Sequence, residues 1–411
     1  MTAPRHFRRA IGRVEFIALV AALMGLNAIA IDIMLPALPA MGATLGLVHE
    51  NERQLVISAY LVGFGTMQLL IGPIADRFGR RVPLLIGIAV YVACALLAPL
   101  APNLAVLLAL RALQGVGAAG TRVLGQAIVR DRHAGTEMAE VLSLANMAFL
   151  VLPVISPALG QAILVIGHWQ DIFRLMALLG VVMAGWVWFR LPETLAPEHR
   201  RPLQFGSLVQ GFRIVLAERA ALAYGLASMF MLGALFGFIN SAQQIFVEVY
   251  GLGTLFPAAF AAVAGLQSAA AFANARLVRR LGARRITRLA AFGYAGVGAV
   301  MAATSLFGDL PFAGFFTLLL CIMCLFTWAN SNMNALSMGP LGQVAGTASS
   351  AFGFIQTVGG TLLGMLVGQA YDGTTRPISF GYLLMGLLAL VAVQVAEHGR
   401  LFGRQPQPRN G

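Results

Sequence analysis

Long apolar stretches alternate with short polar segments along almost the whole chain. A helix needs about 20 mostly apolar residues to cross the hydrocarbon core of a bilayer. Runs of this length predict twelve membrane-spanning helices near 16–38, 54–75, 82–101, 103–129, 138–165, 171–190, 220–247, 254–278, 286–306, 311–337, 346–371 and 378–398. Because these runs follow one another closely, the pattern leaves no room for a soluble domain. It predicts an all-α integral membrane protein.

The second half of the chain repeats motifs of the first. A polar knot at 71–81 has a degraded copy at 277–285, and the Ala-Gly-Thr of 134–136 recurs at 345–347. Paired six-helix repeats are typical of transporters that rock around a binding site near mid-membrane. We therefore predict two pseudo-symmetric six-helix bundles joined by a polar cytoplasmic linker, with boundaries at 1–190, 191–219 and 220–411.

The composition makes the bilayer the main solvent of this chain. Hydrophobic residues make up 59% and charged residues only 11% of it, whereas soluble domains carry roughly 25% charged residues. The net charge of +12 could suggest a nucleic-acid partner. The basic residues lie in short loops between apolar runs, however, which is a topology signal. We expect a lipid bilayer and no nucleic acid as partner.

The loop arginines predict the orientation of the helices. If the amino terminus is cytoplasmic, then Arg5, Arg8 and Arg9 and most other loop arginines fall on the cytoplasmic side. The opposite side is left with Arg53, Arg174 and Arg376. Cytoplasmic loops carry an excess of basic residues, so both termini are predicted to be cytoplasmic.

Several motifs resemble signatures of the major facilitator superfamily. The loop Gly72-Pro-Ile-Ala-Asp76-Arg77-Phe-Gly79-Arg80-Arg81 is similar to the signature between its second and third helices. In the predicted fourth helix, the segment Arg111-Ala-Leu-Gln114-Gly115 resembles the second motif of the superfamily. The predicted fifth helix contains Pro153 and the segment Ser156-Pro157-Ala-Leu-Gly160. These residues resemble the proline-glycine motif of the drug:proton antiporter branch of the superfamily. The run from Asp32 to Pro39 is similar to the Bcr/CflA drug-resistance group of that branch.

This resemblance implies a monomeric, multi-pass protein of the bacterial inner membrane. Its function would be proton-coupled multidrug efflux by alternating access. The substrates would be amphipathic drugs such as phenicol- or bicyclomycin-like compounds, exchanged for protons. No cofactor or metal is implied, because the proton gradient supplies the energy.

Three charged residues lie well away from the ends of the predicted helices and need a specific reason to be there. Asp32 lies roughly 24 Å along the first helix at 1.5 Å per residue; it either exchanges a proton in competition with substrate or is a helix-end carboxylate wetted by headgroups. The depth of Asp32 favours proton coupling, and the resemblance favours a coupling role for Arg111. Arg122 shares the predicted helical face of Arg111 and Gly115, which predicts a stripe lining a central cavity. Alternatively, Arg122 snorkels to the membrane surface.

The loop cluster predicts a conformational latch. Asp76 can lie against the N-terminus of the eleventh helix near Gly346, where free N–H groups favour an anion. Arg80 can pair with Asp131. Such contacts would hold the cytoplasmic side closed in the outward-facing state. The latch residues are Gly72, Asp76, Arg77, Gly79, Arg80 and Asp131. The alternative is that these charges only set topology.

Polar residues within the helices predict a substrate cavity. Neutral amides among Phe and Met would hydrogen-bond amphipathic molecules without charge preference, although such residues also pack between helices. The predicted cavity residues are Gln114, Gly115, Arg122, Asn146, Asn240, Gln244, Asn330, Asn334 and Gln356.

Other functional classes find less support in the sequence. No nucleotide-binding loop and no Ser/His/Asp or metal-ligand grouping occurs in it, so we expect no enzyme. The alternative within the same fold is a proton-coupled exporter or importer of a single metabolite such as a sugar, amino acid or nucleoside. A non-transporting sensor or scaffold would have no need for Asp32 and Arg111 within the membrane.

Overall fold

The structure is a computed structural model that describes residues 11–200 and 205–397. Arg5, Arg8 and Arg9 lie outside these residues, as do the outer ends of the two predicted bundles. Within the described residues every regular element is helical, and twelve helices are long and apolar enough to cross a membrane. The predicted fold class and number of spans are therefore confirmed.

The first half of the chain forms the first six spans, which we call the first bundle. Its elements are α1 (Arg13–Asp32), η1 (Leu35–Ala37), α2 (Leu38–Thr44), η2 (Glu50–Gln54), α3 (Leu55–Phe78), α4 (Arg81–Leu97), η3 (Ala98–Leu100), α5 (Leu104–Arg132), α6 (Gly135–Ile166) and α7 (Trp169–Arg190).

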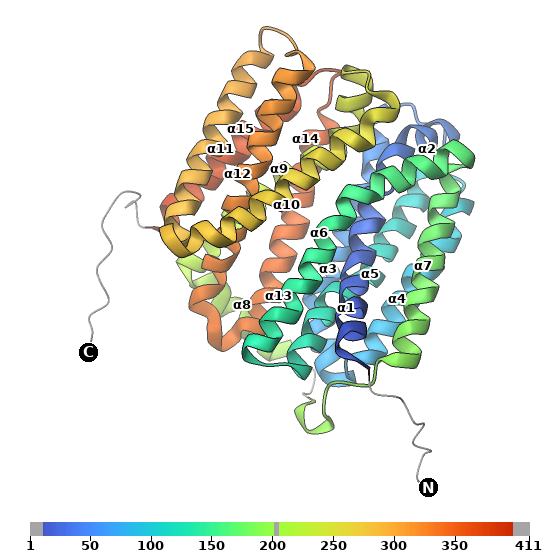
Figure 1. The fold of residues 1–411 in the computed structure, drawn as a ribbon, viewed down its shortest axis with the longest axis vertical. Helices are drawn as coiled ribbons and strands as arrows, with labels where there is room; N and C mark the ends of the chain where they lie inside the picture. The colour runs from blue at the N-terminus through green and yellow to red at the C-terminus, as the bar shows by residue number, and fades with distance from the viewer. Residues whose placement is uncertain (1–10, 201–204, 398–411) are drawn as a thin grey trace.

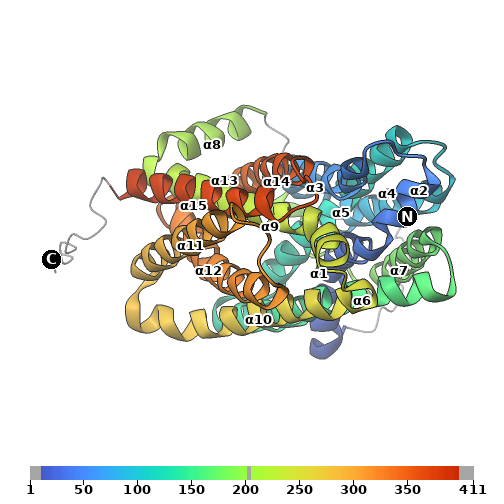
Figure 2. The same cartoon turned by 90° about the horizontal axis from the view of Figure 1, so that it is seen from above.

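The second half forms the other six spans, which we call the second bundle. Its elements are α9 (Arg219–Gln243), η5 (Gln244–Val249), η6 (Gly253–Leu255), α10 (Phe256–Leu281), α11 (Ala283–Ser305), α12 (Phe312–Met338), η7 (Gly339–Val344), α13 (Ala345–Phe354), η8 (Ile355–Gly359), α14 (Gly360–Gln369) and α15 (Arg376–Ala396). The two bundles lie side by side in Figure 1 and, from above, in Figure 2. They meet where α6 contacts α10 and where α3 contacts α13, η8 and α14.

Glycines allow the helices of the first bundle to pack closely. A Cβ atom at Gly115 of α5 would overlap the Tyr60 carbonyl of α3, and one at Gly63 would overlap the Ala112 carbonyl. Small residues at helix contacts let membrane helices approach each other in this way. Gly115 therefore sets the distance between α3 and α5.

The linker contains a helix that the sequence pattern did not predict. After η4 (Pro197–His199), α8 (Phe205–Ala217) packs on α13. A Cβ atom at Gly211 would lie 2.5 Å from Cγ2 of Thr347. Phe212 and Val215 contribute to a small apolar cluster with Ala348. The linker was predicted as a polar connection between the bundles. Its helix α8 instead packs on the first turns of the eleventh span.

Two spans change from α- to π-helical hydrogen bonding. The seventh does so at η5 and the eleventh at η8. Single π-turns inside α-helices occur frequently at functional sites, and both of these lie where the second bundle faces the first. The sequence pattern predicted the seventh span, 220–247, as a continuous α-helix without a π-turn.

Candidate functional site

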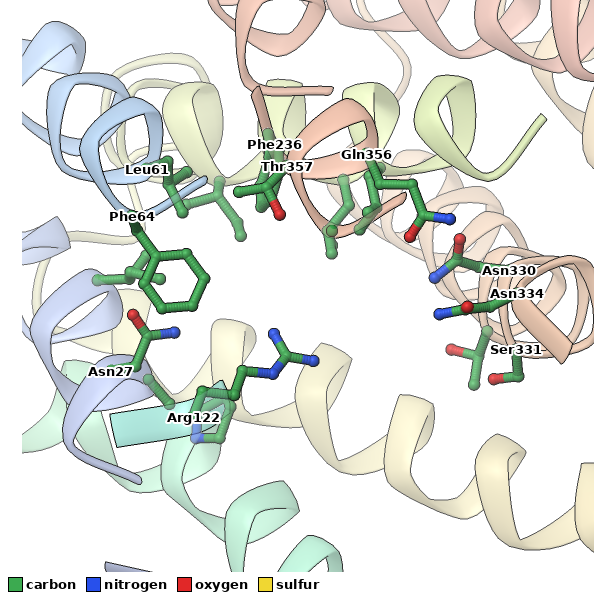
Figure 3. Close-up of a pocket in the computed structure, with 18 of the residues that line it drawn as sticks. Asn27, Leu61, Phe64, Arg122, Phe236, Asn330, Ser331, Asn334, Gln356 and Thr357 are labelled. Carbon is green, nitrogen blue, oxygen red and sulfur yellow. The ribbon is translucent and has the colours of Figure 1, made fainter. Parts of the chain in front are cut away.

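A cavity of about 780 Å³ lies between the two bundles. Helices α1, α3, α5 and α6 line it from the first bundle, and α9, α10, α12, α13 and η8 line it from the second. Pockets of roughly 300–1,000 Å³ accommodate drug-sized ligands. Figure 3 shows polar side chains of both bundles facing this space.

Asp32 is the last residue of α1 and lines the cavity. Its side chain is buried, and no described residue forms a hydrogen bond or ion pair with it. The helix-end position agrees with one of the two predicted readings, but the side chain faces the space between the bundles and not an exposed rim. Its role in proton coupling stays a prediction.

The antiporter motif packs α6 against α1 next to Asp32. A Cβ atom at Gly160 would overlap the carbonyl of Ile33. Pro153 lines the cavity, and Pro157 lies within α6, one turn further on. The motif therefore supports the end of α1 that carries the carboxylate.

Arg111 lies within the first bundle and does not line the cavity. Its guanidinium donates to the carbonyls of Ala30 at 3.0 Å and Val56 at 3.2 Å and to Oε1 of Gln114 at 2.7 Å. It also lies 4.5 Å from the centre of the Tyr60 ring. Arg111 thus joins α1, α3 and α5, and the predicted stripe of cavity-lining residues on α5 is wrong at this position.

Gln114 and Gly115 are likewise absent from the described cavity wall. Gln114 is fully buried and holds Arg111. Gly115 faces the backbone of α3. Gln114 supplies an acceptor to the buried arginine, and Gly115 allows α3 and α5 to approach because it has no side chain. Both positions therefore serve helix packing.

Arg122 and Asn146 line the cavity as predicted. Figure 3 shows the Arg122 side chain reaching into the space that separates Asn27 from the amides of α12. The cavity-lining alternative for Arg122 therefore agrees with the structure, and the snorkelling alternative does not.

The second bundle contributes neutral polar groups to the cavity. Asn330 and Asn334 of α12 and Gln356 of η8 line it. Oγ of Ser228 donates to Oδ1 of Asn330 at 2.5 Å. These amides face the first bundle across the cavity, together with several phenylalanines.

Further polar residues of the wall were not predicted. Asn27 lies on α1, and its Oδ1 accepts a hydrogen bond from the Tyr60 hydroxyl at 2.8 Å. The other polar residues of this kind are Gln68, Gln126, Gln267, Thr327, Ser349, Ser350 and Thr357. Asn27 could have been found because it lies five residues before Asp32 on the same predicted helix.

Asn240 and Gln244 lie outside the described cavity wall, at the end of the molecule where the bundles are joined. Asn240 bonds to Ser58, with 3.2 Å between Nδ2 and Oγ, and Gln244 bonds to Gln54 and Asn51. These residues close one end of the space between the bundles, which we call the closed end. Their predicted place in the substrate cavity is wrong in this conformation, because the opposing bundle occupies it.

An ion pair also crosses the closed end. Arg53 of η2 pairs with Glu248 of η5, and Arg53 is buried. Nearby, Nδ2 of Asn51 donates to the carbonyls of Gln369 at 3.1 Å and Tyr371 at 2.8 Å. Polar bonds thus join the first bundle to both the seventh and the eleventh spans.

The opposite end carries the 71–81 loop. Nε of Arg80 lies 2.9 Å from Oδ2 of Asp131, and its Nη1 lies 2.6 Å from Oδ1 of Asp76. Gly79 has a φ of 91°, and Glu193 accepts from the backbone N–H of Arg80 at 2.8 Å. The predicted Arg80–Asp131 pair is present, and Glu193 is an additional partner that was not predicted.

The predicted contact between Asp76 and the eleventh span is absent among the described residues. Asp76 pairs with Arg80 within its own bundle, and α8 lies on Thr347 instead. Gly72 does approach Ser350 of α13, since a Cβ atom there would lie 3.5 Å from its Oγ. Arg77 lies against the Phe78 ring at the end of α3. That these residues hold the cytoplasmic side closed in the outward-facing state stays a prediction.

Comparison with known proteins identifies the family. Residues 20–365 match the family model of the Major Facilitator Superfamily. The bicyclomycin resistance protein homolog of Haemophilus influenzae is 29% identical over 369 residues, which cover 88% of this chain and 90% of that protein. The multidrug resistance protein MdtL of Salmonella typhi is 29% identical over 388 residues, covering 90% and 93%.

Solved structures agree on the fold. The crystal structure of a D-xylose-proton symporter superposes with a TM-score of 0.70 at 14% identity, covering 93% of this chain and 95% of that one. The helix count, the paired bundles and the family match all agree. The chain therefore belongs to the major facilitator superfamily.

Proposed function

We propose that this protein is a proton-coupled multidrug efflux antiporter of the Bcr/CflA group in a bacterial inner membrane. The names of the two relatives above support export of drugs. The observation that carries the proton coupling is the position of Asp32, buried without a partner among the described residues and facing a cavity between two bundles. A carboxylate there is costly to ionise alone, so a proton or a bound substrate changes its energy.

With the arginine-rich loops in the cytoplasm, the closed end faces the periplasm. The cavity then communicates with the cytoplasmic side, where Met338, Ser349 and Ser350 line it. A substrate enters there, the bundles rock, and protonation of Asp32 from the periplasm resets the transporter. The single-metabolite alternative uses the same steps with one narrow substrate.

Everted vesicles test this proposal. Adding a phenicol antibiotic to energised vesicles that contain the protein should release protons, seen as a partial loss of the pH gradient. The Asp32→Asn variant should insert normally but release none, because an amide cannot exchange a proton. Asp372→Asn, at an exposed acid outside the spans, is the matched control and should behave like wild type. Proton release by Asp32→Asn at the wild-type rate would remove Asp32 from the coupling step.

A further inference from the structure

Two charged side chains of opposite sign define the electrostatics of the cavity. Among the described residues, Asp32 and Arg122 are the charged ones that line it. Both belong to the first bundle. The described residues of the second bundle that face them are uncharged: amides, hydroxyls, phenylalanines and aliphatic side chains. The charge recognition of a ligand therefore takes place on one wall, and neutral hydrogen bonding takes place on the other.

The helix packing fixes the separation of these two charges. Helices α1 and α5 run in opposite directions: Arg111 bonds to the Ala30 carbonyl, and a Cβ atom at Gly125 would lie 3.8 Å from Cγ of Met24. Arg122 is therefore level with the part of α1 around Asn27, and both residues line the cavity. Five residues of helix separate Asn27 from Asp32, which is about 7.5 Å along the axis.

Each of the two charges favours a different part of a ligand. Asp32 is buried without a described partner, so its ionised form is stabilised by a cation that enters the cavity. Arg122 keeps its charge under all physiological conditions and reaches into the cavity. It attracts an anionic group and repels a second cation.

We propose that the cavity prefers zwitterionic amphipathic molecules to purely cationic ones, with the cationic centre of the ligand at Asp32 and its anionic group at Arg122. The inference rests on the proposed function and adds the substrate class and the residue that determines it. A cationic centre competes directly with the proton for Asp32, and the anionic group adds affinity at Arg122. The amides of α12 and η8 hold the neutral remainder. Purely cationic dyes, in contrast, meet the Arg122 charge.

A matched pair of dyes tests the inference. Rhodamine 110 is a zwitterion, and rhodamine 123 is its methyl ester, which keeps the cation and lacks the anion. We expect detergent-purified wild type to bind rhodamine 110 at least about tenfold more tightly by fluorescence polarisation, the value for one charge-assisted hydrogen bond. Arg122→Gln should abolish this preference by weakening the binding of rhodamine 110 and by relieving the repulsion of rhodamine 123. Arg122→Lys should retain most of the preference.

Controls separate this inference from the proposed function. Arg276→Gln, at an exposed arginine of α10 outside the cavity wall, should leave the preference unchanged. Equal binding of the two dyes by wild type, no binding of rhodamine 110, or an equal loss for both dyes in Arg122→Gln would overturn the inference. Selective binding without dye export from cells would instead contradict the proposed efflux function and leave the selectivity intact.

Discussion

Two arginines of α5, Arg111 and Arg122, illustrate how differently one residue type is used. Arg111 is fully buried and donates to Ala30, Val56 and Gln114. Arg122 extends into the cavity. Both lie within an apolar helix, so the sequence pattern could not separate them. The distinction arises because α1 and α3 cover Arg111, whereas Arg122 faces the cavity between the bundles.

This difference predicts different costs of substitution. Arg111→Gln leaves the carbonyls of Ala30 and Val56 without their donor, and we expect a loss of at least about 2 kcal/mol of stability. Arg122→Gln should cost less stability, since the Arg122 side chain reaches into the cavity and not between α1 and α3. Thermal unfolding followed by size-exclusion chromatography in detergent compares the two. Equal midpoints for both variants would contradict the structural role of Arg111.

Five of the nine residues predicted for the cavity do line it, as does the predicted coupling residue Asp32; the five are Arg122, Asn146, Asn330, Asn334 and Gln356. They could be predicted because a polar side chain in an apolar span is conspicuous. Gln114, Asn240 and Gln244 satisfy the same criterion but lie in helix and bundle contacts. In a membrane helix the lipid-facing and buried faces are both apolar, so periodicity does not indicate which way a residue points.

At the scale of elements, close helix packing depends on glycine. A Cβ atom at Gly115 would overlap the Tyr60 carbonyl, whereas one at Gly185 of α7 would meet nothing within 4 Å. Gly115→Ala must push α3 and α5 apart, and overpacking of this kind costs about 1–3 kcal/mol. Gly185→Ala is the control and should unfold at the wild-type temperature. If Gly115→Ala unfolds at the same temperature as Gly185→Ala, the α3–α5 contact tolerates the extra methyl group.

Most boundaries of the spans were predicted to within a few residues from apolar length, but the first span was predicted to end at 38, whereas α1 ends at Asp32. The π-turns η5 and η8 and the linker helix α8 were not predicted. A π-turn shifts hydrogen bonds within a continuous apolar run, so composition does not reveal it. Helix α8 is stabilised by its contact with α13, which a local pattern cannot contain.

At the scale of the whole molecule, the closed end holds the two bundles together. The Arg53–Glu248 pair joins η2 to η5, and partly exposed pairs contribute up to about 1 kcal/mol. Arg53→Ala should therefore favour opening at this end by about fivefold. The readout is the rate at which a water-soluble maleimide labels Ser58→Cys, a buried position at this end, in a protein whose three native cysteines are replaced.

A charge exchange provides the control for this prediction. Arg53→Glu combined with Glu248→Arg restores opposite charges across the bundles and should restore slow labelling. Labelling of Arg53→Ala at the wild-type rate would show that the amide bonds around Asn51 and Gln244 hold the closed end without the ion pair.

The sequence by itself determined the twelve spans, the pairing of the halves, the family and the presence of charges within the membrane. These properties follow from apolar length, loop charge and short motifs, all of which are local along the chain. Only the tertiary structure decided which polar residues face the cavity, which join the bundles at the closed end and which hold neighbouring helices. Those assignments depend on contacts between segments far apart in sequence, such as Arg53 with Glu248, and no single span specifies its own neighbours.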